Sequence, residues 1–246
     1  MPELPDVEGF RRLLAAHAVG RRIERAEVRD PAVLRNADPE AVARDLRGRR
    51  FDEPERRGKW LFARTDGPIL LFHFGMSGAL VWTEAGDELH RHDRLVLGLD
   101  HGELRFRDQR KLQGVWLAKD DRESESITGP LGPDALDISL PDLRERLGGR
   151  RRRVKAALMD QELIAGIGNI LADEILWQAR IHPGRGIDDL DDEEWNRLQQ
   201  SLSRVVSESA AAGQVPRLPS WLSGVRDQDA PRCPRCGTIF EAIKYD

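Results

Sequence analysis

Hydrophobic residues recur with helical spacing near the start of the chain. They lie three or four positions apart at Val7, Phe10, Leu14 and Ala18, which is the period of an amphipathic helix. Gly20 then provides a helix stop. A second helix is expected to follow Asp38-Pro39 as far as Gly48, because aspartate caps a helix and proline suits its first position.

From Phe51 to Lys119 the pattern changes to short apolar runs. The runs 69–74 and 95–99 are bounded by turn signals such as Asp66-Gly67, which is typical of strands. Helical spacing returns in the second half, over residues 141–147, 154–159, 169–179 and 190–211. The sequence therefore predicts an α+β protein with a mainly β first half and a helical second half.

Charge changes this picture only when it is read locally. The net charge of −4 and the isoelectric point of about 5.9 argue against a nucleic-acid partner. However, residues 143–186 contain nine Arg and Lys against five Asp and Glu, and an acidic run follows over 188–194. This pattern fits either a basic patch or an ordinary solvated surface. No apolar stretch approaches about 18 residues and no signal peptide is apparent, so we expect a cytoplasmic protein without a membrane partner.

A glycine-flanked turn, Ile164-Ala-Gly-Ile-Gly-Asn169, separates two of the helical patterns. Gly166 and Gly168 allow a turn with accessible amides, and Asn169 can cap the next helix, so the segment can hold a phosphate. The basic residues Arg150 to Arg153 and Lys155 just upstream suit a grip on a DNA backbone that is independent of sequence. The alternative is a tight turn between helices that simply requires glycine.

The N-terminus, Met1-Pro2-Glu3-Leu4-Pro5-Asp6-Val7-Glu8, offers a nucleophile. Removal of Met1 would leave proline first, and an α-amino group titrates near pH 8, well below lysine. A secondary amine that attacks a sugar C1′ carbon gives an iminium, and Glu3 can serve as the general acid. Alternatively, these acids merely complement the dipole of a helix start.

These segments together resemble the formamidopyrimidine-DNA glycosylase and endonuclease VIII family of DNA repair enzymes. The resemblance covers nearly the whole chain. It rests on Pro2 to Glu8, Arg57-Gly58-Lys59-Trp60, His73 to Gly78, Asp108-Gln109-Arg110, Leu158 to Gln161, the glycine turn and His182-Pro183. It implies an N-terminal helix with a two-layer β-sandwich, a helix-two-turns-helix domain and a C-terminal zinc finger.

Residue roles follow from the resemblance position by position. Pro2 matches the Schiff-base nucleophile, Glu3 its acid/base partner and Lys59 a phosphate ligand on a β-hairpin turn. Asn169 with the Gly166 and Gly168 amides would hold the DNA backbone, helped by Lys155. Met76, Arg110 and Leu112 match wedge residues that fill the gap left by a flipped nucleotide. For Met76 and Leu112 the alternative is ordinary core packing.

The chain departs from the family pattern at several points. The family commonly has Glu at the position of Asp6, and an aromatic residue often stands at that of Leu112. The stretch 211–230 has no counterpart of the longer loop over oxidised purines. Cys233 and Cys236 form one CxxC pair, whereas a zinc ribbon needs a second pair roughly 15 to 20 residues later. Zinc is thus the indicated cofactor, at an incomplete site, and no organic cofactor is expected.

The resulting prediction has four segments. Residues 1–120 form the catalytic β-sandwich domain, 121–137 a linker, 138–226 the helix-two-turns-helix domain and 227–246 an incomplete zinc-finger-like tail. The expected activity is that of a monomeric, bifunctional DNA glycosylase and AP lyase, acting on double-stranded DNA with oxidised bases or abasic sites. The alternatives are a weakened or inactive relative that only binds damaged DNA, and an architectural DNA binder. The preferred lesion is left open.

Overall fold

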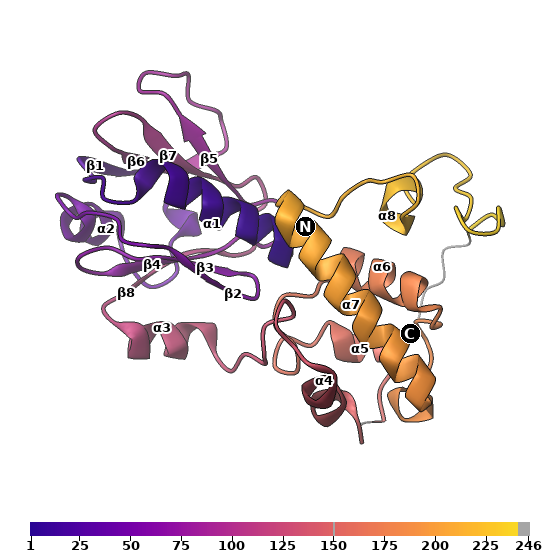
Figure 1. Ribbon diagram of the computed structural model, residues 1–246. Helices are drawn as coiled ribbons and strands as arrows, with labels where there is room; N and C mark the ends of the chain where they lie inside the picture. The colour runs from indigo at the N-terminus through magenta and orange to yellow at the C-terminus, as the bar shows by residue number, and fades with distance from the viewer. Residues whose placement is uncertain (150, 241–246) are drawn as a thin grey trace. The chain divides into compact units, whose positions relative to one another are not determined.

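The first half of the chain folds into two four-stranded antiparallel sheets (Figure 1). One sheet has the order β1-β6-β7-β5 and the other β2-β3-β4-β8. The strands are β1 (Arg25–Val28), β2 (Glu55–Arg57), β3 (Trp60–Ala63), β4 (Ile69–His73), β5 (Ala79–Thr83), β6 (Asp93–Gly98), β7 (Glu103–Arg107) and β8 (Gly114–Ala118). The computed structural model describes residues 1–149 and 151–240.

The chain divides into two compact units. The first unit comprises Met1–Pro2 and Asp6–Pro130, and the second comprises Glu3–Pro5 and the residues from Leu131 onward. Helix α1 (Leu4–Ala18) opens the chain, as predicted, and starts three residues before Val7. The described part of the chain contains no helix that is both long and apolar enough to cross a membrane.

Two further helices belong to the first unit, together with the short 3-10 helix η1 (Pro31–Val33). Helix α2 (Pro39–Leu46) has the predicted cap, because the Asp38 carboxylate accepts a hydrogen bond from the Ala41 amide at 2.7 Å. Helix α3 (Asp121–Thr128) corrects the prediction of a linker over 121–137. Asp120 caps this helix at the Glu123 amide, and the helix packs against β8.

The main core of the first unit draws on both sheets and on α1. Its buried side chains include Leu14 of α1, Phe72 of β4, Leu97 of β6 and Phe106 of β7. Leu71, the residue before Phe72 in β4, points to the opposite face of the sheet. There it belongs to a smaller cluster with Trp60, Trp116 and Ile127 of α3. This alternation along the strand is what a sheet with both faces covered requires.

The second unit is helical. Its elements are α4 (Leu140–Leu147), α5 (Val154–Leu158), α6 (Asn169–Ala179), η2 (Ile187–Asp189), α7 (Asp192–Ala212) and α8 (Leu222–Val225). Helix α7 has a capping box, in which the Asp191 side chain accepts from the Glu194 amide while Glu194 reaches back to the Asp191 amide. The core is formed mainly by α6 and α7, whose buried residues include Ile175 and Leu202.

Candidate functional site

Glu3 is held by the N-terminus of α6 within the second unit. Its carboxylate is fully buried and accepts three backbone hydrogen bonds, from Gly168 at 3.0 Å, Ile170 at 2.8 Å and Leu171 at 3.0 Å. These donors belong to the amides that a helix leaves unpaired in its first turn, where the helix dipole favours a negative charge. The predicted acid/base residue therefore has a fixed position.

The glycine turn forms the seat for this carboxylate, and this corrects one prediction. The Gly168 amide donates to Glu3 and the Gly166 amide donates to the Gln161 side chain at 3.0 Å. Both amides are thus used inside the protein and cannot cradle a phosphate as they stand. The residue that caps α6 is Gly168, while Asn169 is the first residue of the helix.

Glycine is required in this turn for two different reasons. Gly166 has a φ of +110°, and a Cβ there would also meet the Leu4 side chain at 2.5 Å. Gly168 has an ordinary φ of −120°, but a Cβ would overlap the Glu3 carboxyl group. Gln161 belongs to the sequence motif, but the sequence assigned no role to it. Its Nε2 donates to the Ile167 carbonyl at 2.9 Å, so it braces the turn on both sides.

Pro2 directly precedes Glu3 in the chain and belongs to the first unit. Its side chain is half-buried, whereas Met1 before it is 46% exposed. Met1 is therefore not packed into either core. Removal of Met1 would convert the Pro2 nitrogen into a free secondary amine, one residue before Glu3 in the chain.

Lys59 lies in the turn between β2 and β3, as the sequence predicted. The adjacent Gly58 has a φ of +55°, which this tight turn needs. His73, at the end of β4, is the titratable neighbour that the sequence reasoning missed. Burial, and secondarily the charge of Lys59, lowers the pKa of His73 to about 4. Its Nδ1 accepts the Gly75 amide at 3.2 Å, which requires the neutral ring at that nitrogen.

Two of the three predicted wedge residues are in direct contact. Met76 lies in the turn after β4, and Arg110 in the loop between β7 and β8. The Arg110 guanidinium donates to the Met76 sulfur at 3.1 Å. Leu112, on the same loop as Arg110, is 52% exposed and Met76 is 45% exposed. The alternative of ordinary core packing for Met76 and Leu112 is therefore wrong.

Ser77 and Asp108 tie the two wedge segments together, and neither was assigned a role from the sequence. The Ser77 hydroxyl donates to the buried Asp108 carboxylate at 2.5 Å. The Arg110 backbone amide donates both to the Ser77 hydroxyl oxygen and to Asp108 Oδ1, each at 3.0 Å. Arg35 fixes the far end of the loop by donating to the Lys111 and Gln113 carbonyls. Exposed apolar side chains on a braced loop are available for a partner.

Lys155 and Asn169 line one cavity of the second unit, together with residues of α6 and of the tail. Lys155 forms an ion pair with Asp173 at 2.5 Å. The predicted phosphate ligand is thus already engaged by a carboxylate of the same chain. Arg151, Arg152 and Arg153 of the predicted basic segment are exposed, and Arg150 lies outside the described residues.

Cys233 and Cys236 lie on a short turn. The Cys233 amide donates to the Thr238 carbonyl and the Gly237 amide to the Cys233 carbonyl, both at 2.8 Å. Within residues 1–149 and 151–240, no group of three or more His, Cys, Asp or Glu side chains could hold a metal ion. Two thiols alone do not fit the four-ligand set of a structural zinc site. Residues 241–246 of the predicted tail lie outside the described part.

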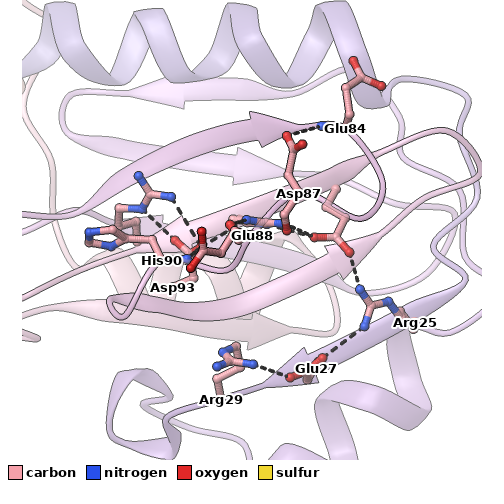
Figure 2. Close-up of polar contacts among 11 residues, drawn as sticks. Arg25, Glu27, Arg29, Glu84, Asp87, Glu88, His90 and Asp93 are labelled. Carbon is pink, nitrogen blue, oxygen red and sulfur yellow. Dashed lines mark hydrogen bonds and ion pairs between the residues drawn. The ribbon is translucent and has the colours of Figure 1, made fainter.

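A buried ionic network in the first unit was not predicted. Arg105 is 1% exposed and donates to the carboxylates of Glu103, at 2.6 and 2.9 Å, and of Asp93, at 3.4 Å. It also donates to the carbonyls of Asp87 and Glu88 in the loop between β5 and β6. Glu103 also pairs with Arg25, and Figure 2 shows the ion pairs continuing from Arg25 through Glu27 to Arg29 at the surface. Arg105 therefore holds the loop onto its sheet.

Two family models match the chain. Residues 1–115 match the formamidopyrimidine-DNA glycosylase N-terminal domain, and residues 131–216 match the formamidopyrimidine-DNA glycosylase H2TH domain.

The chain is also similar to individual relatives over almost all of its length. It is 44% identical to the formamidopyrimidine-DNA glycosylase of Symbiobacterium thermophilum, over 99% of this chain and 85% of the relative. It is 37% identical to that of Moorella thermoacetica, over 99% and 95%. Among solved structures, the Lactococcus lactis enzyme bound to DNA containing an AP site has a TM-score of 0.90 at 28% identity, over 99% and 95%. A complex of the same enzyme with DNA containing an oxidised pyrimidine has a TM-score of 0.89, also at 28% identity and over 99% and 95%.

Proposed function

Because the chain belongs to the formamidopyrimidine-DNA glycosylase family of DNA repair enzymes, we propose that it excises oxidised bases with Pro2 as nucleophile and then cleaves the strand as an AP lyase. The observation that carries the proposal is the buried carboxylate of Glu3, which three backbone amides hold one residue after Pro2. The substrate is double-stranded DNA with an oxidised base or an abasic site. The protein acts as a monomer.

The chemistry begins once Met1 has been removed. The Pro2 nitrogen lone pair attacks C1′, the bond from C1′ to the base breaks, and the base leaves with a proton. Glu3 takes the proton that the Pro2 nitrogen loses and delivers it to the departing base. The nitrogen lone pair then breaks the C1′–O4′ bond, and O4′ takes a second proton from solvent by way of Glu3. The product is a ring-opened iminium ion between Pro2 and C1′.

Strand cleavage follows from the same iminium. The positive nitrogen draws electrons and acidifies the hydrogen on C2′. A general base can then remove this proton, and the 3′ phosphate leaves by β-elimination. Water then hydrolyses the iminium and releases Pro2. These steps balance with the side chains, the DNA and water, so the proposed reaction calls for no organic cofactor.

The remaining site residues place the nucleotide. Lys59, on its short hairpin turn, binds a phosphate as a point charge. The exposed side chains of Met76 and Leu112 replace stacking lost when the nucleotide leaves the helix, and Arg110 hydrogen-bonds the base left opposite. Asn169 and Lys155 grip the backbone without reading sequence.

Borohydride trapping tests the proposal. Reduction of the iminium with an abasic-site duplex should give a covalent adduct, and peptide mapping should place the DNA on Pro2. Trapping of Pro2→Gly as well as wild type, or Met1 retained in active protein, would exclude this nucleophile. Binding of abasic DNA without trapping or excision would instead support the alternative of an inactive damage-binding protein.

A further inference from the structure

The second unit has a cavity of about 830 Å³ that is lined by basic side chains. Only one of them, Lys155, belongs to the segments that the sequence analysis assigned to DNA binding. Four basic side chains line it, namely Lys155, Arg180, Arg226 and Arg235, together with His182 and a single carboxylate, Asp173. Among the lining side chains, four cations against one carboxylate leave an excess of three positive charges, in a chain whose net charge is −4. Such a concave basic surface attracts anions.

Asp173 occupies the place of an anion between two of these cations. One of its oxygens lies 2.5 Å from the Lys155 ammonium and the other 3.0 Å from the Arg226 guanidinium. The side chains of Asp173, Lys155 and Arg226 are 17%, 23% and 29% exposed, so solvent reaches all three. A phosphodiester presents anionic oxygens that accept from the same donors.

Glu174, the next residue on α6, has the contacts of a carboxylate with a structural role. Glu174 is fully buried, and it accepts from the Ser223 amide at 2.8 Å and from the Leu222 amide at 3.3 Å. Glu174 therefore holds the start of α8. The Asp173 carboxylate instead faces two side-chain cations. Another anion can take its place between them while the contacts of Glu174 with the backbone stay intact.

Arg235 brings a third cation to the cavity wall. Its guanidinium lies 4.2 Å from the centre of the Trp177 ring and donates to the Trp177 carbonyl at 3.0 Å. Stacking on an aromatic ring orients the group and leaves its charge in place.

We infer that Asp173 is an internal counter-ion that competes with a DNA phosphate for Lys155 and Arg226. The inference rests on the proposed function, and it adds Arg226 and Arg235 to the backbone grip. The ion pair keeps both cations in position when DNA is absent. It also lowers affinity for every duplex alike, since no base is contacted, and so favours release from damaged and undamaged DNA equally.

The test is equilibrium binding of an undamaged duplex to the full chain across a salt series. Asp173→Asn should bind about three- to tenfold more tightly at low salt, with a log-log salt slope steeper by roughly 0.9 for each additional phosphate that the protein neutralises. Asp173→Ser should show the same increase in affinity, and thermal melting confirms that each variant is folded. Arg226→Ala should weaken binding more in the Asp173→Asn background than in wild type.

The matched control is Glu193→Gln, which removes one negative charge from the ion pair with Arg197 on α7, at 2.8 Å. It should shift affinity much less than Asp173→Asn, and an equal shift would reduce the effect to net charge and overturn the inference. Unchanged or weaker binding by both folded Asp173 variants would also overturn it. So would tighter binding of inorganic phosphate at constant ionic strength with no change for the duplex.

The outcome is separable from that of the proposed function. If the wild-type chain forms a covalent adduct with abasic DNA while the Asp173 variants bind no more tightly, only this inference is overturned. If the Asp173 variants bind DNA more tightly but the wild-type chain never forms a covalent adduct with abasic DNA, only the proposed chemistry is overturned.

Discussion

The Oε2 atom of Glu3 lies 3.0 Å from the backbone nitrogen of Leu171, although 168 residues separate the two in the chain. The same oxygen accepts from Gly168. The N-terminal segment is thereby attached to the first turn of α6, and the carboxylate has the position of a bound anion at a helix start. The catalytic proposal depends on this attachment.

Glu3→Gln should separate the two proposed reactions. The amide cannot give up the proton that base departure needs, so excision should fall by about 10²- to 10⁴-fold. Cleavage at a preformed abasic site should fall less, because no base remains to be expelled. Single-turnover assays on both substrates measure the difference. Equal losses would mean that Glu3 only positions its neighbours.

Gly168→Ala should lower excision through geometry alone. The backbone at Gly168 tolerates alanine, but the new methyl group would displace the Glu3 carboxyl group. A shift of about 1 Å at a reacting group can cost about 100-fold in rate. Gly186→Ala is the control, because its methyl group would meet only the exposed Asp189 side chain. Full activity in Gly168→Ala would contradict the seat described for Glu3.

Met76→Ala should slow excision of a stacked lesion and leave abasic-site cleavage nearly unchanged, since an abasic nucleotide has little stacking to replace. The side chain is 45% exposed, so the free energy of unfolding should change by no more than about 0.5 kcal/mol. Leu89→Ala, another exposed apolar side chain, is the control and should affect neither reaction. A stability loss of about 2 to 5 kcal/mol would mark Met76 as a core residue.

His73 should make stability depend on pH between about 4 and 6.5. Its folded pKa is lowered to about 4 from 6.5, so the unfolded chain binds the extra proton within this window. The stability contributed by the neutral ring is therefore complete above pH 6.5 and is lost as the pH falls toward 4, by up to about 3 kcal/mol. Denaturant titrations of wild type and His73→Gln should converge at low pH. Parallel curves would show that His73 titrates normally.

Arg105→Ala should lower the free energy of unfolding by about 3 to 5 kcal/mol, because Asp93 and Glu103 would keep buried charges without this partner. Arg29→Ala provides the comparison, since it breaks an exposed pair with Glu27 at 3.0 Å and should cost no more than about 1 kcal/mol. Chemical denaturation measures both. A small effect in Arg105→Ala would mean that solvent enters the site readily.

The sequence predicted the structure correctly where the interacting residues lie close together in the chain. Asp38 caps α2 three residues away at Ala41, and the apolar runs of the first half form strands, because caps and periodicity involve residues close together in sequence. The linker prediction failed at α3 because its charged sequence carries little apolar periodicity. That helix is stabilised by the Asp120 cap and by packing on β8.

The sequence by itself determined the β-rich first half and the helical second half, the motif around Pro2 and Glu3, and the family these motifs resemble. Only the tertiary structure decided what the motifs contact. Gly168 donates to Glu3 and not to a phosphate, and Lys155 pairs with Asp173. A glycine turn has the same local pattern whichever acceptor faces it. Which group faces it depends on how the chain packs over separations of more than a hundred residues, and no local spacing records that distance.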